Sequence, residues 1–333
     1  MTSTSVTRWG ILGTGAIASD FTEDLSLLDD AKAVAVGSRS QSNADTFAER
    51  FGIPNRHGSY EDLVADPDVD VIYVSTPNPF HYDNAMLAIS AGKSVLVEKP
   101  FTLNAREARN LVAAARTSGV FLMEAMWTRF LPNMVEIREI VTSGLLGDIR
   151  VVTADCSILL ERDPTERHFD PGLGGGVLLD LGVYALSYVS MLLGAPTAIK
   201  SISDPAFTGV DAQTSILLQQ RGGAHAVINL TMEARGANRA TIVGTEARIE
   251  IDSMFFRPTT FSVIRPDGTA QVHDQVHVGN GLRYEAAEVG RCLGLGLSES
   301  PWMPLDESIE IVATLDTIRG QIHLVYPNES VTQ

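Results

Sequence analysis

Residues 8–18, RWGILGTGAIA, constrain the fold of this chain more than any other stretch. A short apolar run, typical of a buried strand, leads into a glycine turn, and an alanine-rich segment typical of a helix follows without a gap. Gly13 permits the sharp turn, Gly15 lets backbone approach a ligand, and the small Ala18 lets the helix pack closely on the strand. Because unpaired N–H groups at the start of a helix attract phosphates, the stretch predicts a dinucleotide site, with an ordinary glycine turn as the alternative.

Length, charge and cysteine content narrow the remaining possibilities. A chain of 333 residues is longer than one core usually fills, so two domains are expected. The net charge of -16, from 25 basic and 41 acidic residues, argues against nucleic acid or anionic membranes as partners. Cys156 and Cys292 lie far apart without a CxxC spacing, which predicts no metal site and reduced thiols in a cytoplasmic protein. The polar amino-terminal residues indicate no signal peptide, and we expect no membrane-spanning segment.

Strands and helices alternate through the first third of the chain. After the first strand, further strands are expected at 31–38, 69–75, 94–97 and 121–124, with helices at 16–28, 42–51, 60–65, 80–91 and 104–118. The strand hydrophobicity is continuous rather than alternating, which indicates that both faces of the sheet are covered. This pattern predicts a doubly wound parallel sheet that binds its ligand at the carboxyl ends of the strands.

Two turns at that edge of the sheet are expected to face the cofactor. Thr76-Pro77-Asn78 follows one strand, and Glu98-Lys99-Pro100 follows the next. Lys99 could be a surface lysine, but an ammonium group held at a strand end by proline favours a functional role. The expected cofactor contacts are Gly13, Thr14, Gly15, Ala16, Ile17, Thr76, Pro77, Asn78, His81, Glu98, Lys99, Trp127 and Arg129.

The end of the second strand indicates which dinucleotide is bound. It lies about 20 residues past the glycine turn, where an NAD site would place an acidic residue on the ribose hydroxyls. Here that position holds Ser38 and Arg39. A hydroxyl and a guanidinium can hold a 2′-phosphate through charge-assisted hydrogen bonds, so we expect NADP to be preferred, with NAD as the alternative and a solvated arginine as the simpler explanation.

The alternation stops near residues 124–130, which sets the expected boundary between domains 1–125 and 126–333. From residue 198 onward, segments with alternating hydrophobicity such as 224–230 indicate antiparallel strands with one face exposed or paired. A sheet of that size needs its second face covered, which favours a homodimer. Closing helices are expected at 282–293 and 305–321, one of them able to pack against the first domain.

Together these motifs resemble the glucose-fructose oxidoreductase, inositol dehydrogenase and rhizopine-catabolism (Gfo/Idh/MocA) family. The turn at 13–18, the sequence EKP at 98–100 and GGGVLLDLGVY at 174–184 occur in the family's order, while MEAMWTRF at 123–130 resembles its dimeric dihydrodiol dehydrogenases and NADP-dependent D-xylose dehydrogenases. The resemblance implies a Rossmann domain followed by an α+β domain with a large open, mainly antiparallel sheet, whose outer face often forms a dimer interface.

Asp180 and Tyr184 are the strongest candidates for chemistry in the second half. They are four residues apart on one face of an expected helix, and the leucines around Asp180 indicate burial that requires a cation or several hydrogen-bond donors. We expect Lys99 to be that cation. A phenol with a pKa of about 10 is a poor base at neutral pH, and a nearby ammonium lowers that pKa. We therefore expect Tyr184 to be the general acid/base, Lys99 its electrostatic partner and Asp180 the residue that orients both, as the matching family positions imply; a core tyrosine beside an incidental aspartate is the alternative.

The expected substrate is a cyclic sugar or a trans-dihydrodiol, oxidised at a hydroxyl group or reduced at a carbonyl. Inositol dehydrogenases resemble one another in having histidine where this chain has Tyr184, which argues against inositol. The expected substrate contacts are Lys99, Trp127, Arg167, His168 and Tyr184, with Phe169 as a weaker candidate. A sugar-to-sugar oxidoreductase that retains its cofactor and a non-catalytic dinucleotide-sensing regulator are the alternatives, and the intact Lys99 and Tyr184 argue against the sensor.

Overall fold

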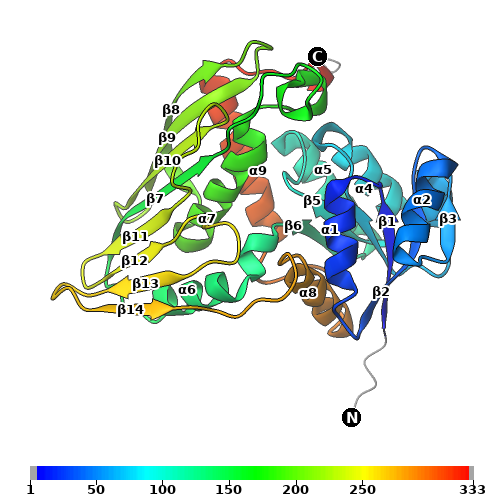
Figure 1. Ribbon diagram of the computed structural model, residues 1–333, viewed down its shortest axis with the longest axis horizontal. Coiled ribbons are helices and arrows are strands. Elements are labelled where there is room, and N and C mark those ends of the chain that lie inside the picture. Colours follow the sequence, from blue (N-terminus) through cyan, green and yellow to red (C-terminus); the bar gives the residue numbers. More distant parts are fainter. Residues whose placement is uncertain (1–5, 330–333) are drawn as a thin grey trace. The chain divides into compact units, whose positions relative to one another are not determined.

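The computed structural model describes residues 6–329, and the chain divides into two compact units (Figure 1). Unit 1 comprises Met1–Trp127 and Val278–Ile309, and unit 2 comprises Thr128–His277 and Glu310–Gln333. Each unit is built around its own sheet. The segment 278–309 thus belongs with the amino-terminal part of the chain, whereas the sequence expectation only allowed one C-terminal helix to pack there.

The sheet of unit 1 has six parallel strands in the order β3-β2-β1-β4-β5-β6, which confirms the predicted doubly wound parallel sheet. The order reverses between β1 and β4, and in such sheets the ligand crevice lies outside the carboxyl ends of the strands at that point. β4 is buried along its whole length, as its continuous apolar sequence predicts. The strands are β1 (Thr7–Leu12), β2 (Ala31–Gly37), β3 (Asn55–His57), β4 (Val71–Val74), β5 (Ser94–Glu98) and β6 (Leu122–Ala125).

Helices α2 and α5 of unit 1 each follow a polar residue and end at a glycine. Asn104 accepts a hydrogen bond from the Glu107 N–H at 3.0 Å, and Gly52 and Gly119 close two helices in the left-handed conformation. Ser40 precedes the second helix, which begins at Gln41, one residue before the predicted start. The helices are α1 (Ala16–Leu25), α2 (Gln41–Phe51), α3 (Tyr60–Ala65), η1 (Asn78–Phe80), α4 (His81–Ser90), α5 (Ala105–Ser118) and α8 (Arg283–Gly294).

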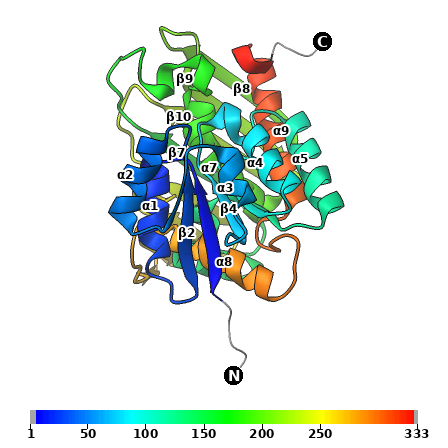
Figure 2. The same ribbon diagram turned by 90° about the vertical axis from the view of Figure 1, so that its right-hand side faces the viewer.

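A buried aspartate joins α8 to the Rossmann core. The Asp24 carboxylate, near the end of α1, accepts backbone N–H groups at 2.7 Å from Asn280, 2.8 Å from Gly281 and Leu282, and 3.2 Å from Arg283. α8 accordingly lies beside α1 in both ribbon views (Figure 1, Figure 2). A carboxylate at the start of a helix satisfies N–H groups that have no partner within the helix and complements its dipole.

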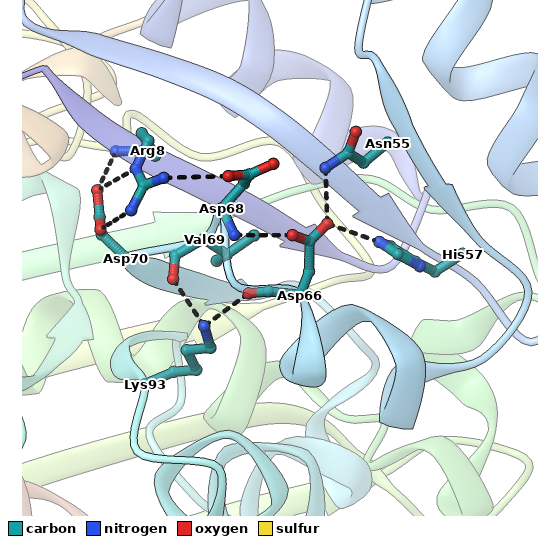
Figure 3. A network of polar contacts seen from close by, with 8 residues as sticks. All are labelled: Arg8, Asn55, His57, Asp66, Asp68, Val69, Asp70 and Lys93. Atoms are coloured by element: carbon teal, nitrogen blue, oxygen red, sulfur yellow. Dashed lines mark hydrogen bonds and ion pairs between the residues drawn. The ribbon is translucent and has the colours of Figure 1, made fainter.

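Polar contacts also fasten the opposite edge of the parallel sheet, at the amino ends of the strands (Figure 3). Arg8 at the start of β1 contacts the Asp70 carboxylate through its backbone N–H at 2.9 Å and its Nη2 at 2.8 Å. Lys93, just before β5, donates to the carbonyls of Asp66 and Val69 at 2.7 and 2.8 Å. These bonds fix the strand register far from the expected ligand edge, and we assign them a structural role.

The sheet of unit 2 has eight strands, in the order β14-β13-β12-β11-β7-β10-β9-β8, and is antiparallel except where β10 pairs with β7. This confirms the expected large, mainly antiparallel sheet. Burial alternates along β9, β10 and β12, so one face is covered and the other is exposed. The strands are β7 (Ile149–Ser157), β8 (Pro196–Pro205), β9 (Asp211–Gln220), β10 (His225–Thr231), β11 (Ala240–Gly244), β12 (Arg248–Ile251), β13 (Phe261–Ile264) and β14 (Ala270–His273).

Helices α6 (Pro132–Thr142) and α7 (Val183–Leu193) cover one face of this sheet (Figure 1). A π-helical turn, η5 (Leu178–Gly182), precedes α7, whereas the sequence predicted one regular helix over these residues. The long helix α9 (Leu305–Gln321) and the short turn η6 (Pro327–Glu329) follow near the C-terminus.

The segment Pro171–Leu193 is long and apolar enough to cross a membrane by length and composition, which the sequence reading had overlooked. In the structure 78% of its most apolar window is buried within the fold. Its composition is therefore explained by its place in the core of unit 2.

Candidate active site

The glycine turn between β1 and α1 has the geometry that a phosphate site requires. Gly13 has φ +110°, and a Cβ there would lie 3.0 Å from the Ser75 Oγ, so both conformation and space call for glycine. Beside Gly15 nothing described lies within 4 Å of an added Cβ, while Ala18 is completely buried. Within residues 6–329 no side chain caps α1, which leaves its first N–H groups available to a ligand. The turn can hold a pyrophosphate in the way proposed for residues 13–17.

At the end of β2, Ser38 is buried and Arg39 is exposed. The Tyr60 hydroxyl at the start of α3 forms a hydrogen bond with Arg39. Burial raises the pKa of Tyr60, and the Arg39 guanidinium opposes that rise. Together with Ser38, the pair brings a cation and two hydroxyl groups to the carboxyl end of β2, and Tyr60 is a member of this group that the sequence reading missed.

His81 connects the two turns that were expected to face the cofactor. Its Nδ1 lies 2.8 Å from the Pro100 carbonyl oxygen and its Nε2 lies 2.7 Å from the Thr76 carbonyl oxygen. Burial and, to a smaller extent, the nearby Lys99 charge lower the pKa of His81 to about 4. Both partners are acceptors, so the neutral ring, which has a single N–H, makes only one of these two hydrogen bonds, and only a protonated ring would make both.

Glu98 and Lys99 stand at the carboxyl end of β5, as expected. One Glu98 oxygen accepts the Tyr73 hydroxyl and the other accepts the Lys99 backbone N–H at 3.1 Å. Glu98 is 5% exposed, so its carboxylate serves to fix the strand end. Lys99, which is half-buried, extends from a backbone held on both sides.

In unit 2, Asp180 lies in a network of three polar side chains from the loop before η5. Its carboxylate contacts the Arg167 Nη2 at 3.2 Å and the His168 Nε2 at 3.4 Å, and the His168 Nδ1 lies 2.8 Å from the Glu166 Oε1. The Asp180 side chain is 17% exposed, and Arg167 is a cation beside it within unit 2. The structure thus brings together three residues that sequence reasoning had proposed separately, and adds Glu166.

Tyr184 is the second residue of α7, which follows the π-helical turn that carries Asp180. Its ring stacks on Phe256 with centroids 5.2 Å apart and an interplanar angle of 14°. Phe256 is 6% exposed and fixes the plane of the phenol. Sequence reasoning missed Phe256 because it lies in a loop, where no periodic pattern indicates a partner.

Two further predicted residues lie at the junction of the chain segments. Trp127 closes the first part of unit 1 and is 8% exposed. Arg129 is 2% exposed, and it donates from Nε to the Ser187 hydroxyl at 2.8 Å and from Nη2 to the Ser187 carbonyl at 2.9 Å. Arg129 therefore supports α7, the helix that carries Tyr184. Lys99 belongs to unit 1, and its predicted cluster with Asp180 and Tyr184 stays a prediction.

Comparison with known families matches both halves of the chain. Residues 7–126 match an oxidoreductase family with an NAD-binding Rossmann fold, and residues 134–250 match a GFO/IDH/MocA C-terminal domain. Trans-1,2-dihydrobenzene-1,2-diol dehydrogenase from Mus musculus is 40% identical over 332 residues, covering 97% of this chain and 98% of its own. The Homo sapiens protein of the same name is 38% identical over 331 residues, with the same coverage.

Solved structures resemble the whole chain. KijD10, a 3-ketoreductase from Actinomadura kijaniata in complex with NADP and TDP-benzene, has a TM-score of 0.84 at 25% identity, covering 96% of this chain and 98% of its own. Aldose-aldose oxidoreductase from Caulobacter crescentus has a TM-score of 0.87 at 24% identity, with the same coverage, and shares the fold.

Proposed function

The chain belongs to the Gfo/Idh/MocA family of NAD(P)-binding oxidoreductases, and we propose that within this family it is an NADP-dependent dehydrogenase of cyclic diols or sugars. The observation that carries the proposal is the 40% identity to a trans-dihydrodiol dehydrogenase over nearly the whole of both chains. Tyr184, stacked on an aromatic ring and one turn from the Asp180 carboxylate, supports a proton-transfer role.

The proposed chemistry divides between cofactor and protein. When bound, the nicotinamide supplies the hydride acceptor or donor. The Tyr184 phenol takes the proton from the substrate hydroxyl during oxidation and returns it during reduction. Lys99 favours the phenolate by its positive charge, and Asp180, paired with Arg167 and His168, keeps that end of the site polar and ordered. The Phe256 ring limits the orientation of the phenol and offers an apolar neighbour to a cyclic substrate.

NADP is the proposed cofactor because Arg39 and Ser38 occupy the end of β2 where an acidic residue would serve NAD. Tyr60 supports this assignment, since its hydrogen bond holds the guanidinium beside the same strand end. A solved structure of the 3-ketoreductase KijD10, which has the same fold, contains NADP.

We further propose that the protein is a homodimer formed through the exposed face of the unit 2 sheet. Ile202, Leu217 and Val227 expose 73%, 47% and 37% of their surface. An apolar surface of this kind on an open sheet favours a second copy. Multi-angle light scattering would test this, and a monomer at micromolar concentration would contradict it. A cytoplasmic location, without nucleic acid or membrane partners, stays a prediction.

The function is tested with a panel of aldoses, polyols and trans-dihydrodiols, each assayed by nicotinamide absorbance with NADP and with NAD. We expect turnover of at least one diol or sugar, and a loss of about 100-fold or more in kcat for Tyr184→Phe with NADP affinity retained. Turnover only in the presence of a second sugar, with NADP bound tightly throughout purification, would indicate a sugar-to-sugar oxidoreductase. NADP binding without turnover of any substrate would indicate a sensor.

A further inference from the structure

A second buried aspartate, Asp211, holds the turn from which the proposed catalytic helix begins. It is the first residue of β9 and is 3% exposed. Its Oδ2 accepts the Leu178 backbone N–H at 2.9 Å and the Thr214 hydroxyl at 2.9 Å. Leu178 is the first residue of η5, so this bond fixes the start of the turn that presents Asp180 and, four residues later, Tyr184.

Gly176, just before η5, packs directly against this carboxylate. Gly176 has φ +107°, and a Cβ there would lie 2.1 Å from the Asp211 Oδ1. Its N–H donates to the His168 carbonyl at 2.9 Å, and the Gly175 N–H donates to the Asp170 carbonyl at 3.0 Å. The turn therefore also positions the loop that carries His168, whose ring contacts Asp180. A movement of the turn would therefore displace both Asp180 and its partner His168.

A residue of the C-terminal segment, Tyr326, also contacts this turn. The fully buried Tyr326 hydroxyl donates to the Gly175 carbonyl at 2.6 Å. Arg319 on α9 lies 5.3 Å from the centroid of the Tyr326 ring and forms ion pairs with Asp316 and Glu329, each at 2.6 Å. Arg319 and Tyr326 are also the charged and titratable groups that act on Asp211 from the elements around it.

Burial and the neighbouring donors shift the pKa of Asp211 in opposite directions. Burial raises its pKa to about 7, while the Thr214 hydroxyl, the Leu178 N–H and the Arg319 charge oppose this rise. Within residues 6–329, no group donates a hydrogen bond to its Oδ1, which helps to explain why burial prevails. A carboxylate is a stronger acceptor than a carboxylic acid, so ionisation strengthens the bond to Leu178.

We propose that Asp211 is a positioning residue: its ionised carboxylate holds the Leu178 N–H and thereby the turn that carries Asp180 and Tyr184, and loss of its charge lowers turnover. This inference depends on the proposed function for its effect on turnover, but the bond to Leu178 can be tested without a substrate. Asp211 does not touch substrate or cofactor in this account. It acts through the turn alone.

The first test measures kcat against pH for the intact protein with a substrate from the panel. Wild type should lose turnover below a pH of about 7, and Asp211→Asn, which keeps the shape but cannot titrate, should lack this inflection. Thr214→Val removes a hydroxyl that lowers the pKa of Asp211, so its inflection should move to higher pH. Asp204→Asn, a matched change at an exposed position on β8, should leave the profile as in wild type. An unchanged inflection in Asp211→Asn would overturn the proposal.

The second test needs no activity. Amide hydrogen exchange in the peptide covering residues 175–182 should be about tenfold faster in Asp211→Asn than in wild type, because the Leu178 N–H loses a charge-assisted acceptor. Thr214→Val should show the same increase at pH values just above neutrality, which keeps the test decisive if Asp211→Asn does not fold. Equal protection in wild type and both variants would refute the anchoring role. If wild type turns over no substrate, the proposed function fails, while the exchange result still decides on Asp211.

Discussion

Replacing Asp24 by Asn should destabilise unit 1 more than any exposed carboxylate can. Oδ2 accepts three backbone N–H groups and Oδ1 accepts one. The amide has one acceptor oxygen, so even in its better orientation one N–H faces the amide NH2, at a cost of about 1–3 kcal/mol. The other three bonds lose their charge-assisted character, about 1 kcal/mol each. We therefore expect the free energy of unfolding to fall by about 4–6 kcal/mol, a large part of the stability of a typical domain.

The assay is urea unfolding followed by circular dichroism, with Glu23→Gln as the matched control on the same helix. Glu23 pairs with Arg50 at 2.6 Å, but the two side chains are 48% and 58% exposed, so the control should lose at most about 1 kcal/mol. Hydrogen exchange adds a local readout, because the amides of residues 280–283 should lose protection first in Asp24→Asn. A free energy of unfolding within about 1 kcal/mol of wild type would refute the account of how α8 is held.

Two further predictions concern the cofactor site and the buried acid of α8. Arg39→Ala should raise the KM for NADP by about 10- to 100-fold and leave that for NAD nearly unchanged, because only NADP has the 2′-phosphate; equal effects on both would contradict the assignment. Burial, with the charges of Glu98, Asp24 and Glu124, raises the pKa of Glu285 well above 4.5. The folded protein thus holds this proton more tightly than the unfolded chain, so stability falls as pH rises above about 4.5, and Glu285→Gln should flatten that fall in urea midpoints measured at about pH 6 and 9. An unchanged slope would contradict it.

Much of unit 1 could be predicted because its signals are local. Glycines, caps and continuous apolar strands all act within a few residues, and they specified the parallel sheet. β3 was missed because it contains three polar residues, Asn55–His57, and pairs only with the end of β2. β14 was missed for a similar reason, since Ala270–His273 is exposed at the sheet edge and shows no hydrophobic alternation.

Parts of the proposed site could be predicted where a residue's chemistry requires a particular kind of partner. Asp180 in an apolar helix calls for polar partners, and the structure supplies the Arg167 guanidinium and a contact with the His168 ring within the same unit, both of which the sequence had suggested for the substrate pocket. Tyr60 and Phe256 were not found because their roles depend on three-dimensional neighbours, Arg39 and Tyr184, to which no sequence spacing links them. The π-helical form of η5 was equally hidden, because its residues also suit a regular helix.

Asp24 and Asp211 make long-range contacts that local sequence patterns do not predict. Each is buried and each holds the amino end of a helical segment that is remote in sequence, 257 residues away for Gly281 and 33 for Leu178. They differ in the donors they receive: Asp24 is offered four backbone N–H groups, whereas Asp211 is offered one N–H and one hydroxyl, with Oδ1 left facing Gly176. A carboxylate with many donors is held firmly and contributes to stability, while one with few donors changes charge near neutrality. The number of donors around a buried aspartate therefore bears on how firmly it holds a helix start: four N–H groups fix Asp24 at α8, whereas the fewer donors at Asp211 leave burial to raise its pKa, and we infer that the start of η5 responds to pH.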